Sequence, residues 1–278
     1  MRVLWFSILV GLVLGIAVAS SNRAMAQCAY YTGTTSADAI AIGRAVDEDL
    51  TFFGYPACLG QCSPCYSGSN CSTWVRTVRN YARVCRQTGA TWTSTDLTSC
   101  TTSLSSSDSA TLLGRQGDDV IGPHVGADQL CTATATHRNY VADFNAAFSF
   151  GLALQGEGGA DHLYGSSNPD RLYSNWPDEG YSDADGADDL MCGFGGDDIL
   201  RGDGDDSSSF EECMFGGTQV TSDQCDGEYG ASGSATWDEH FACESASDAA
   251  SYAIATRCSP HYSICTASQA PRILSGEG

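Results

Sequence analysis

Lysine is absent from this chain of 278 residues, and 13 arginines face 34 acidic residues. The formal net charge of −21 at pH 7 opposes binding to nucleic acid, because phosphates and such a surface repel each other. Two common hydrolase signatures are missing too. No His-Glu-x-x-His motif occurs, and Gly230-Ala-Ser-Gly-Ser234 fails to complete Gly-x-Ser-x-Gly. The composition therefore argues against a nucleic-acid partner, and these two catalytic motifs are lacking.

Long apolar runs are absent after residue 18, so no later segment is predicted to cross a membrane. The first residues have the pattern of a secretory signal peptide: Arg2, an apolar stretch, and Ala24-Met25-Ala26 as the cleavage site. We predict that residues 1–26 are removed and that the protein is secreted, with the periplasm or the cell surface as alternative destinations. An uncleaved anchor is the weaker alternative, because the apolar stretch is short for a membrane span.

All 14 cysteines follow the predicted cleavage site. An even number in an exported chain predicts disulfide bonds, although spacing alone leaves their pairing open. Cys62-Ser-Pro-Cys65 also matches a redox motif and, with Cys58 and Cys71, a zinc site. Disulfide bonds are the favoured interpretation in so cysteine-rich a segment.

The middle of the chain contains acidic residues at a nine-residue spacing. They are Asp161, Asp170, Glu179, Asp188, Asp197 and Asp206. Most stand two positions before an apolar residue, in the column Leu163, Leu172, Tyr181, Leu190 and Ile199. Two earlier segments, 117–121 and 126–130, follow the same Gly-x-Asp-x-apolar order around Asp119 and Asp128. Such a short period predicts stacked coils, each with acidic turns and short strands.

These residues resemble a known family. Gly156-Glu-Gly-Gly-Ala-Asp161-His-Leu163 and Cys192-Gly-Phe-Gly-Gly-Asp197-Asp-Ile199 are similar to the repeats-in-toxin (RTX) nonapeptide Gly-Gly-x-Gly-x-Asp-x-U-x. The resemblance implies a right-handed parallel β-roll with calcium held between its turns. It also fits a bacterial source. The signal peptide and the cysteines depart from the toxins of this family, which argues against a cytolytic activity.

The expected calcium sites follow from stacking. If two nonapeptides make one coil, Asp161 lies over Glu179, and carboxylates about 4.8 Å apart repel unless a cation separates them. Calcium, with 6–8 oxygen ligands, suits such turns better than magnesium. The predicted metal ligands are Asp119, Asp128, Asp161, Asp170, Glu179, Asp188, Asp197 and Asp206. The alternative is an acidic solenoid whose Gly-Asp pairs are turn chemistry without an ion.

The chain is predicted to be mainly β, with flanking cysteine-rich regions. Residues 27–90 are interpreted as a small helical domain with helices over 39–46 and 72–88, and residues 91–111 as a Ser/Thr-rich linker. The β-roll would occupy 112–209, with a lateral insertion at 132–150. Residues 210–278 would form a disulfide-rich cap over the open end of the solenoid.

Four arginines, Arg76, Arg79, Arg83 and Arg86, would form a stripe on the second predicted helix. Pairing with the protein's own carboxylates is the favoured explanation. An extracellular polysaccharide or a cell-surface component is the alternative partner.

The leading functional hypothesis is a secreted, non-enzymatic calcium-binding protein of structural or adhesive role. The alternative is a secreted hydrolase that carries the repeats as an accessory module. A pocket that gathers His, Asp and Glu side chains would favour the hydrolase. Acids confined to stacked turns would favour the structural role.

Overall fold

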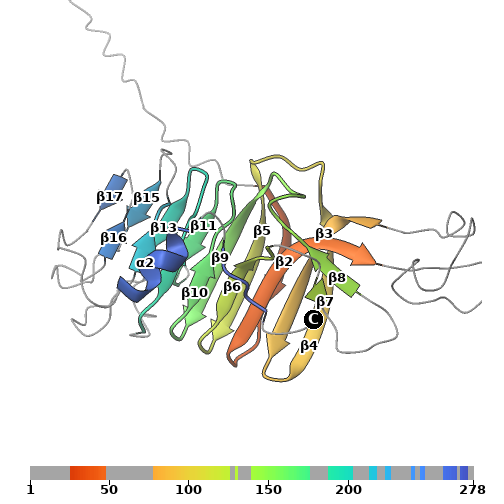
Figure 1. Cartoon of the computed structure of the whole chain (residues 1–278), viewed down its shortest axis with the longest axis horizontal. Coiled ribbons are helices and arrows are strands. Elements are labelled where there is room, and N and C mark those ends of the chain that lie inside the picture. Colours follow the sequence, from red (N-terminus) through yellow and green to blue (C-terminus); the bar gives the residue numbers. More distant parts are fainter. Residues whose placement is uncertain are drawn as a thin grey trace, which may run out of the picture.

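The computed structural model describes residues 26–47, 78–125, 129–130, 139–175, 187–202, 213–217, 223–226, 239–241, 245–247, 259–267 and 270–274. The predicted signal sequence up to residue 25 and the Cys62–Cys65 motif lie outside these ranges. Figure 1 shows the described part as a stack of strands with one short helix on its side.

The described strands form two sheets, here called sheet A and sheet B, and the prediction of a mainly β protein is confirmed. Sheet A contains, in spatial order, β1 (Ala26–Thr32), β5 (Asp108–Gln116), β9 (Gly151–Gly158), β11 (Arg171–Tyr173), β13 (Ile199–Arg201), β15 (Gln224–Asp226) and β17 (Ser245–Ser247). Sheet B contains β16 (Glu239–Phe241), β14 (Cys213–Phe215), β12 (Leu190–Cys192), β10 (His162–Tyr164), β6 (Val120–Pro123), β2 (Asp38–Asp47), β3 (Val78–Thr88) and β4 (Thr91–Thr101). Two further strands, β7 (Gln129–Leu130) and β8 (Asn139–Ala142), join sheet B beside β2.

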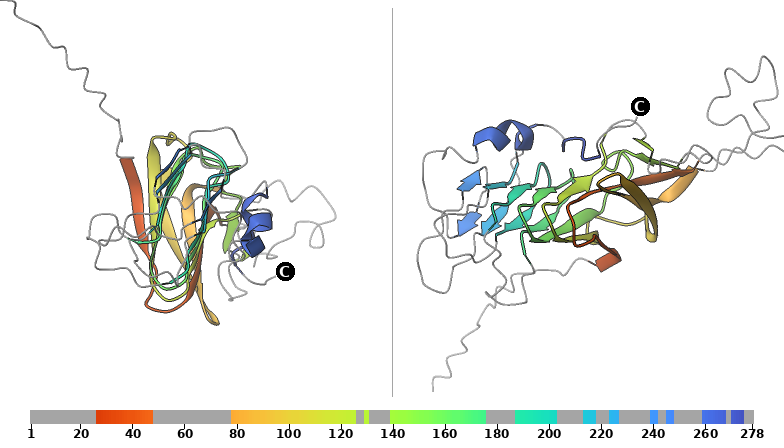
Figure 2. Two further views of the ribbon diagram at one scale, coloured as in Figure 1. Left: turned by 90° about the vertical axis from the view of Figure 1, so that its left-hand side faces the viewer. Right: turned by 90° about the horizontal axis from the view of Figure 1, so that it is seen from below.

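The chain alternates between the two sheets, so that each full circuit adds one strand to each. The circuits run β1–β2, β5–β6, β9–β10, β11–β12, β13–β14 and β15–β16. All pairs in sheet A are parallel, as are the pairs from β16 to β2 in sheet B. Looking along the stack, the left view of Figure 2 shows these circuits superposed.

The core is a narrow apolar layer between the sheets. In sheet A, Leu172 lies in register with Leu154 on one side and Leu200 on the other. In sheet B, Leu163 lies between Ile121 and Met191. All of these side chains are fully buried. Each buried side chain contributes about 1.5–3 kcal/mol, which makes this ladder the main source of stability in the stack.

The predicted helices at 39–46 and 72–88 are wrong in the described part, where β2 and β3 form an antiparallel pair. Successive side chains of β2 face opposite sides of the sheet. Ile40 and Ile42 face the core, while Ala41 faces a second apolar cluster on the opposite side. A strand buried on both faces has apolar residues at nearly every position, which imitates one face of a helix.

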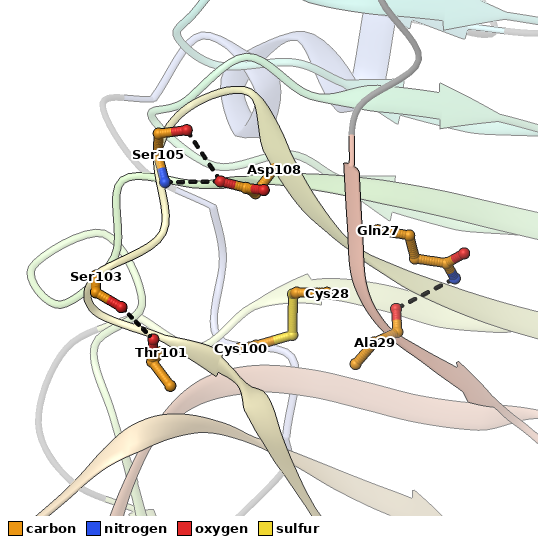
Figure 3. Close-up of a disulfide and its surroundings, with 8 residues drawn as sticks. All are labelled: Gln27, Cys28, Ala29, Cys100, Thr101, Ser103, Ser105 and Asp108. Atoms are coloured by element: carbon orange, nitrogen blue, oxygen red, sulfur yellow. Dashed lines mark hydrogen bonds between the residues drawn. A yellow bond between two sulfur atoms is a disulfide. The ribbon is translucent and has the colours of Figure 1, made fainter.

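The predicted Ser/Thr linker at 91–111 is also wrong, since β4 and the start of β5 occupy most of it. Threonine is β-branched and suits an extended edge strand. A disulfide bond joins Cys100 of β4 to Cys28 of β1, as Figure 3 shows. Because Leu97 and Cys100 belong to the core cluster, β4 contributes to closing the first end of the stack.

The predicted lateral insertion at 132–150 contributes to the core in its described part. Phe144, Phe148 and Phe150 pack with ring centroids 4.9–5.3 Å apart and are almost fully buried. Asn168 Nδ2 donates hydrogen bonds to the backbone oxygens of Phe148 and Phe150. This aromatic plug fills the space between the sheets beside the turn that leads to β11.

The predicted cap at 210–278 is wrong in its described parts, because β14 to β17 continue the two sheets. Helix α2 (Ser259–Cys265) and residues 270–274 lie on the outer face of sheet B instead. A disulfide bond joins Cys265 of α2 to Cys192 of β12. Among the described residues, no helix has the length and apolarity needed to span a membrane.

Candidate functional site: the aspartate turns

Two columns of buried aspartates run along the stack, one at each edge where the chain passes between the sheets. The first column contains Asp38, Asp119, Asp161 and Asp189. The second contains Asp170, Asp198 and Asp223. Each of these side chains is at most 4% exposed.

Except for Asp38 at the end of the first column, each carboxyl group accepts a hydrogen bond from a backbone N–H of the neighbouring coil. In the first column, Asp161 Oδ1 accepts from the N–H of Asp119 at 2.7 Å, and Asp189 Oδ1 accepts from the N–H of Asp161 at 2.7 Å. In the second, Asp198 Oδ1 accepts from the N–H of Asp170 at 2.8 Å, and Asp223 Oδ1 from the N–H of Asp198 at 2.9 Å. The columns therefore bond successive coils through side chain and backbone, in addition to the strand pairing.

A glycine stands five residues before most of these aspartates. The pairs are Gly33 and Asp38, Gly114 and Asp119, Gly156 and Asp161, Gly165 and Asp170, and Gly193 and Asp198. The glycine leaves the space that the carboxyl group occupies. A Cβ atom on Gly165 would lie 2.8 Å from Asp170 Oδ2 and 2.6 Å from the carbonyl oxygen of Gly193 in the next coil.

Three turns follow the order Gly-x-x-Gly-x-Asp and use a left-handed backbone. The second residue of each turn has a positive φ, 90° at Arg115, 75° at Glu157 and 69° at Phe194, and the glycine two residues later has φ of 105–123°. Non-glycine residues rarely adopt such φ values, so the stacked coil must hold them. Oδ2 of Asp119 is buried in such a turn and accepts no hydrogen bond.

Two turns follow a different order, Gly-[Ser/Thr]-[Ser/Thr]-[Ser/Asn]-x-Asp, and satisfy both carboxyl oxygens. Asp38 Oδ2 accepts from the N–H of Thr34 at 2.6 Å and from its hydroxyl at 2.9 Å. Asp170 Oδ2 accepts from the N–H of Ser166 in the same way. In these two turns a Ser or Thr stands where the other turns have the left-handed residue, and its hydroxyl group hydrogen-bonds to the aspartate. Both sequence patterns therefore give turns of the same length.

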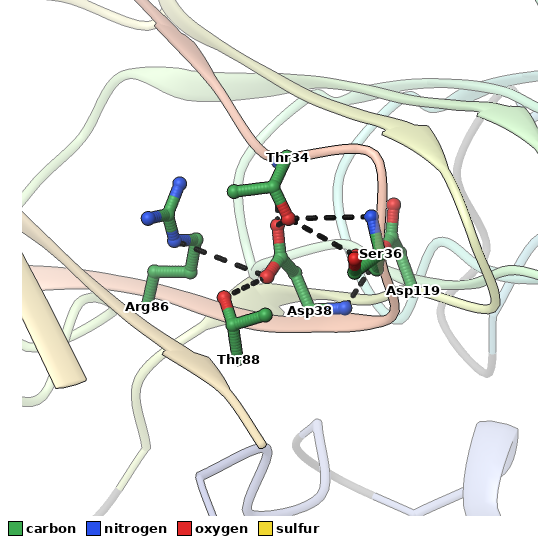
Figure 4. Close-up of polar contacts among 6 residues, drawn as sticks. All are labelled: Thr34, Ser36, Asp38, Arg86, Thr88 and Asp119. Carbon is green, nitrogen blue, oxygen red and sulfur yellow. Dashed lines mark hydrogen bonds and ion pairs between the residues drawn. The ribbon is translucent and has the colours of Figure 1, made fainter. Parts of the chain in front are cut away.

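The first column ends in a polar cap formed by β3. Thr88 donates its hydroxyl hydrogen to Asp38 Oδ1, and Arg86 Nε lies 3.9 Å from the same oxygen, as Figure 4 shows. Arg83 Nε donates to Asp96 Oδ1 at 2.6 Å. These contacts favour internal pairing as the explanation for Arg83 and Arg86, while Arg76 lies outside the described residues. Because the segment is a strand, Arg83 and Arg86 point to opposite faces and form no stripe.

Burial makes the column acids weaker than free aspartic acid. Desolvation raises the pKa of Asp119 to about 7, and the nearby charges of Asp38, Asp118 and Glu157 add to the rise. Desolvation also raises the pKa of Asp170 to about 7. In Asp198, desolvation and the charge of Asp170 raise the pKa to about 10. A neutral acid still accepts the backbone hydrogen bond, so the columns need no positive charge to stack.

Two predicted metal ligands, Asp188 and Asp197, lie outside the columns. Asp188 and Asp197 are exposed, and the next residue along the chain, Asp189 or Asp198, occupies the buried position. Asp161 stacks on Asp189, 28 residues later, rather than on Glu179. The circuit between Asp161 and Asp189 has 28 residues, one more than three nonapeptides, so the buried acid lies one residue after the position that the nine-residue spacing predicts. The core correspondingly uses Met191 and Leu200 rather than Leu190 and Ile199.

Three predicted ligands do lie in the columns: Asp119, Asp161 and Asp170. Their Oδ1 atoms accept the N–H groups of Asp38, Asp119 and Leu152 at 2.6–2.7 Å. Calcium binding by these three residues stays a prediction. No group of three or more metal-binding side chains occurs within the described residues. The other predicted ligands, Asp128, Glu179 and Asp206, lie outside the described ranges.

Sequence reasoning missed four column members: Asp38, Asp189, Asp198 and Asp223. The glycine five residues earlier would have identified Asp38 and Asp198. Asp189 and Asp223 have alanine and threonine at that position, so only the strand register assigns them.

Two histidines meet on the outer face of sheet B. His162 of β10 and His261 of α2 have ring centroids 5.5 Å apart. Burial lowers the pKa of His162, and the neighbouring His261 lowers it further. The contact between the two rings helps to seat α2 on β10. His124, directly after β6, is buried.

Comparison of the chain with protein-family models, curated proteins and solved structures gave no match.

Proposed function

We propose that this protein is a secreted, non-enzymatic structural or adhesion component of the extracellular space, built as a right-handed parallel β-roll. The chain alternates between parallel strands of sheet A and of sheet B, which supports the β-roll, and the right hand is the one that parallel crossovers adopt. The signal-peptide pattern and the two described disulfide bonds support export to an oxidising compartment.

One observation supports the structural role above all: the buried aspartates accept hydrogen bonds from backbone N–H groups. Catalytic carboxyl groups need access to a substrate, whereas Asp119, Asp161 and Asp198 are fully buried and hydrogen-bonded from coil to coil. Acids confined to stacked turns are the arrangement that favours a structural role over a hydrolase.

The test follows the full-length chain in a bacterial host. We expect the protein in the medium or periplasm with Gln27 as its first residue, by intact-mass measurement, and retention on host cell-surface polysaccharide in a pull-down. Retention in the cytoplasm with the leader intact would refute secretion. Failure to bind any cell-surface fraction would refute the adhesion role.

We further propose that the exposed predicted ligands, Asp188 and Asp197, bind calcium. Asp188 and Asp197 each precede a column residue and present a carboxylate to solvent. We expect isothermal titration with CaCl₂ to give heat that is lost in the Asp188→Asn/Asp197→Asn variant. A titration without heat would remove calcium from the proposal and leave the scaffold role untouched.

A further inference from the structure

Helix α2 is joined to the outer face of sheet B by a covalent bond and, one helical turn away, by a contact between two histidine rings. The covalent bond is the disulfide between Cys265 and Cys192 of β12. The ring contact is between His261 and His162 of β10, the strand that pairs with β12. Residues i and i+4 of a helix lie on one face, so His261 and Cys265 both face the sheet. The disulfide bond therefore restricts where the ring of His261 can lie relative to that of His162.

The distance between the two rings suits a shared metal ion. Their centroids lie 5.5 Å apart, and the ring planes meet at 71°. Zinc binds an imidazole nitrogen at about 2.0–2.1 Å, which places the ion about 3.2 Å from the ring centroid. Two imidazoles on one tetrahedral zinc ion then have centroids roughly 5.2 Å apart. The observed separation differs from this value by about 0.3 Å, a change that small side-chain rotations produce.

Ligand chemistry and angle favour zinc over other ions. Imidazole is a preferred ligand of zinc and copper(II), whereas calcium and magnesium take oxygen ligands. Copper(II) prefers tetragonal coordination, with ligands at about 90° or 180°, which would place the centroids roughly 4.5 or 6.4 Å apart. Neither value is as close to the observed separation as that for zinc. Soft copper(I) selects thiolates, but the sulfur atoms of Cys192 and Cys265 are joined in the disulfide bond.

The pair is accessible to an ion and has a negative charge beside it. Both histidines are half-buried, so their rings are partly open to solvent. Tyr164 packs edge-to-face against His162, with centroids 6.2 Å apart, which limits the motion of that ring. The carboxylate of Asp118 accepts the N–H of Ala160 at 3.1 Å. Burial and His261 lower the pKa of His162, while the charge of Asp118 acts in the opposite direction, so this carboxylate lies close enough to favour a cation.

We propose that His162 and His261 bind one zinc ion, which fastens α2 to β10 as a second attachment beside the disulfide bond. Zinc takes four ligands, and these imidazoles supply two of them. Within the part of the chain that the structure describes, no third metal-binding side chain completes the group. Water therefore fills the remaining positions, and the ion exchanges more easily than at a closed structural site. The site uses none of the column aspartates and is independent of the calcium proposal.

Isothermal titration with ZnCl₂ tests the site on the full disulfide-bonded chain, prepared without a histidine tag. Excess CaCl₂ in the buffer occupies oxygen sites but not imidazole nitrogens. We expect a dissociation constant at least tenfold higher in His162→Phe and in His261→Phe than in the wild-type protein. Phenylalanine keeps an aromatic ring at each position and removes both nitrogens, so the ring contact is retained while ligation is lost.

The double variant separates a shared ion from two independent sites. A shared ion needs both rings, so His162→Phe/His261→Phe should bind zinc no more weakly than either single variant. Two measurements on the wild-type protein need no variant. Zinc should slow amide hydrogen exchange of residues 261–267, because it fixes α2 to the sheet. The imidazole nitrogen NMR signals of His162 and His261 should shift, while those of the buried His124 stay constant.

Any of three results would overturn the inference. The first is a wild-type protein that binds zinc no more tightly than the double variant. The second is a loss of binding free energy in the double variant that equals the sum of the two single losses, which would assign zinc to separate single-histidine sites. The third is a set of NMR shifts confined to histidines outside this pair. Each result leaves the outcome of the calcium titration unaffected.

Discussion

Adjacent aspartates in this protein should differ sharply in their contribution to stability. Asp197 and Asp198 are neighbours in sequence, but Asp197 is exposed and Asp198 is fully buried in the second column. Asp198 Oδ1 accepts the N–H of Asp170 at 2.8 Å. We therefore expect Asp198→Ala to destabilise the fold and Asp197→Ala to have little effect.

The magnitude follows from the group left without a partner. Removing the Asp198 carboxyl group leaves the buried N–H of Asp170 unsatisfied, which costs about 1–3 kcal/mol. The small cavity against Gly193 increases this to about 2–3 kcal/mol. For a chain of this size, 1 kcal/mol corresponds to 2–4 °C, so the melting temperature should fall by roughly 4–12 °C. Surface substitutions such as Asp197→Ala usually change stability by less than about 0.5 kcal/mol.

Asp198→Asn provides a matched control. The amide oxygen can still accept the N–H of Asp170, so this variant should keep most of the stability that Asp198→Ala loses. The assay is thermal unfolding by circular dichroism in a buffer with a calcium chelator. Equal losses for Asp197→Ala and Asp198→Ala, or a larger loss for Asp197→Ala, would refute the assignment of the column.

Three further predictions concern the turns and the end of the stack. Gly165→Ala should lower stability by about 1–3 kcal/mol in chemical denaturation, because its Cβ would meet backbone 2.6 Å away, whereas Gly89→Ala, with nothing within 4 Å, tests the effect of positive φ alone. Burial raises the pKa of Asp119 and Asp170 in the folded chain to about 7, whereas the same groups in the unfolded chain lose their protons near pH 4. Because the folded chain then binds more protons than the unfolded chain, the melting temperature should fall as the pH rises from about 4 to about 7. A melting temperature that rises over this interval would show that these acids are charged in the fold. Removing the Cys28–Cys100 bond, which closes a loop with a sequence separation of 72, should cost about 2–4 kcal/mol; equal denaturation midpoints for the reduced and oxidised proteins would contradict its role in closing the end.

The repeat was readable from the sequence because each coil needs the same turn. Glycine provides room for the carboxyl group and permits positive φ, so a regular Gly-Asp pattern marks the turns wherever they occur. Asp119, Asp161 and Asp170 were found in this way. The pattern failed between Asp170 and Asp189, where the circuit is longer and a pair of adjacent aspartates offers two equally plausible residues.

The strands before the repeat were misread for a different reason. Asp38–Asp47 and Val78–Thr88 are buried on both faces by separate apolar clusters, so no polar alternation marks them as strands. The phenylalanines near residue 148 resembled a loop because nothing local shows that they fill the space between two sheets.

Local sequence determined the turn. Each Gly-to-Asp segment of this kind contains its own glycine and either a hydroxyl group or a left-handed residue within six residues, so the turn pattern is local in the sequence, although the stacked coils hold the left-handed residues in place. Only the tertiary structure decided which of two neighbouring carboxyl groups is buried and what it binds, because that depends on a backbone N–H contributed by another coil 18–81 residues away. A hydrogen bond across such a distance depends on strand register, and register is a property of the whole stack.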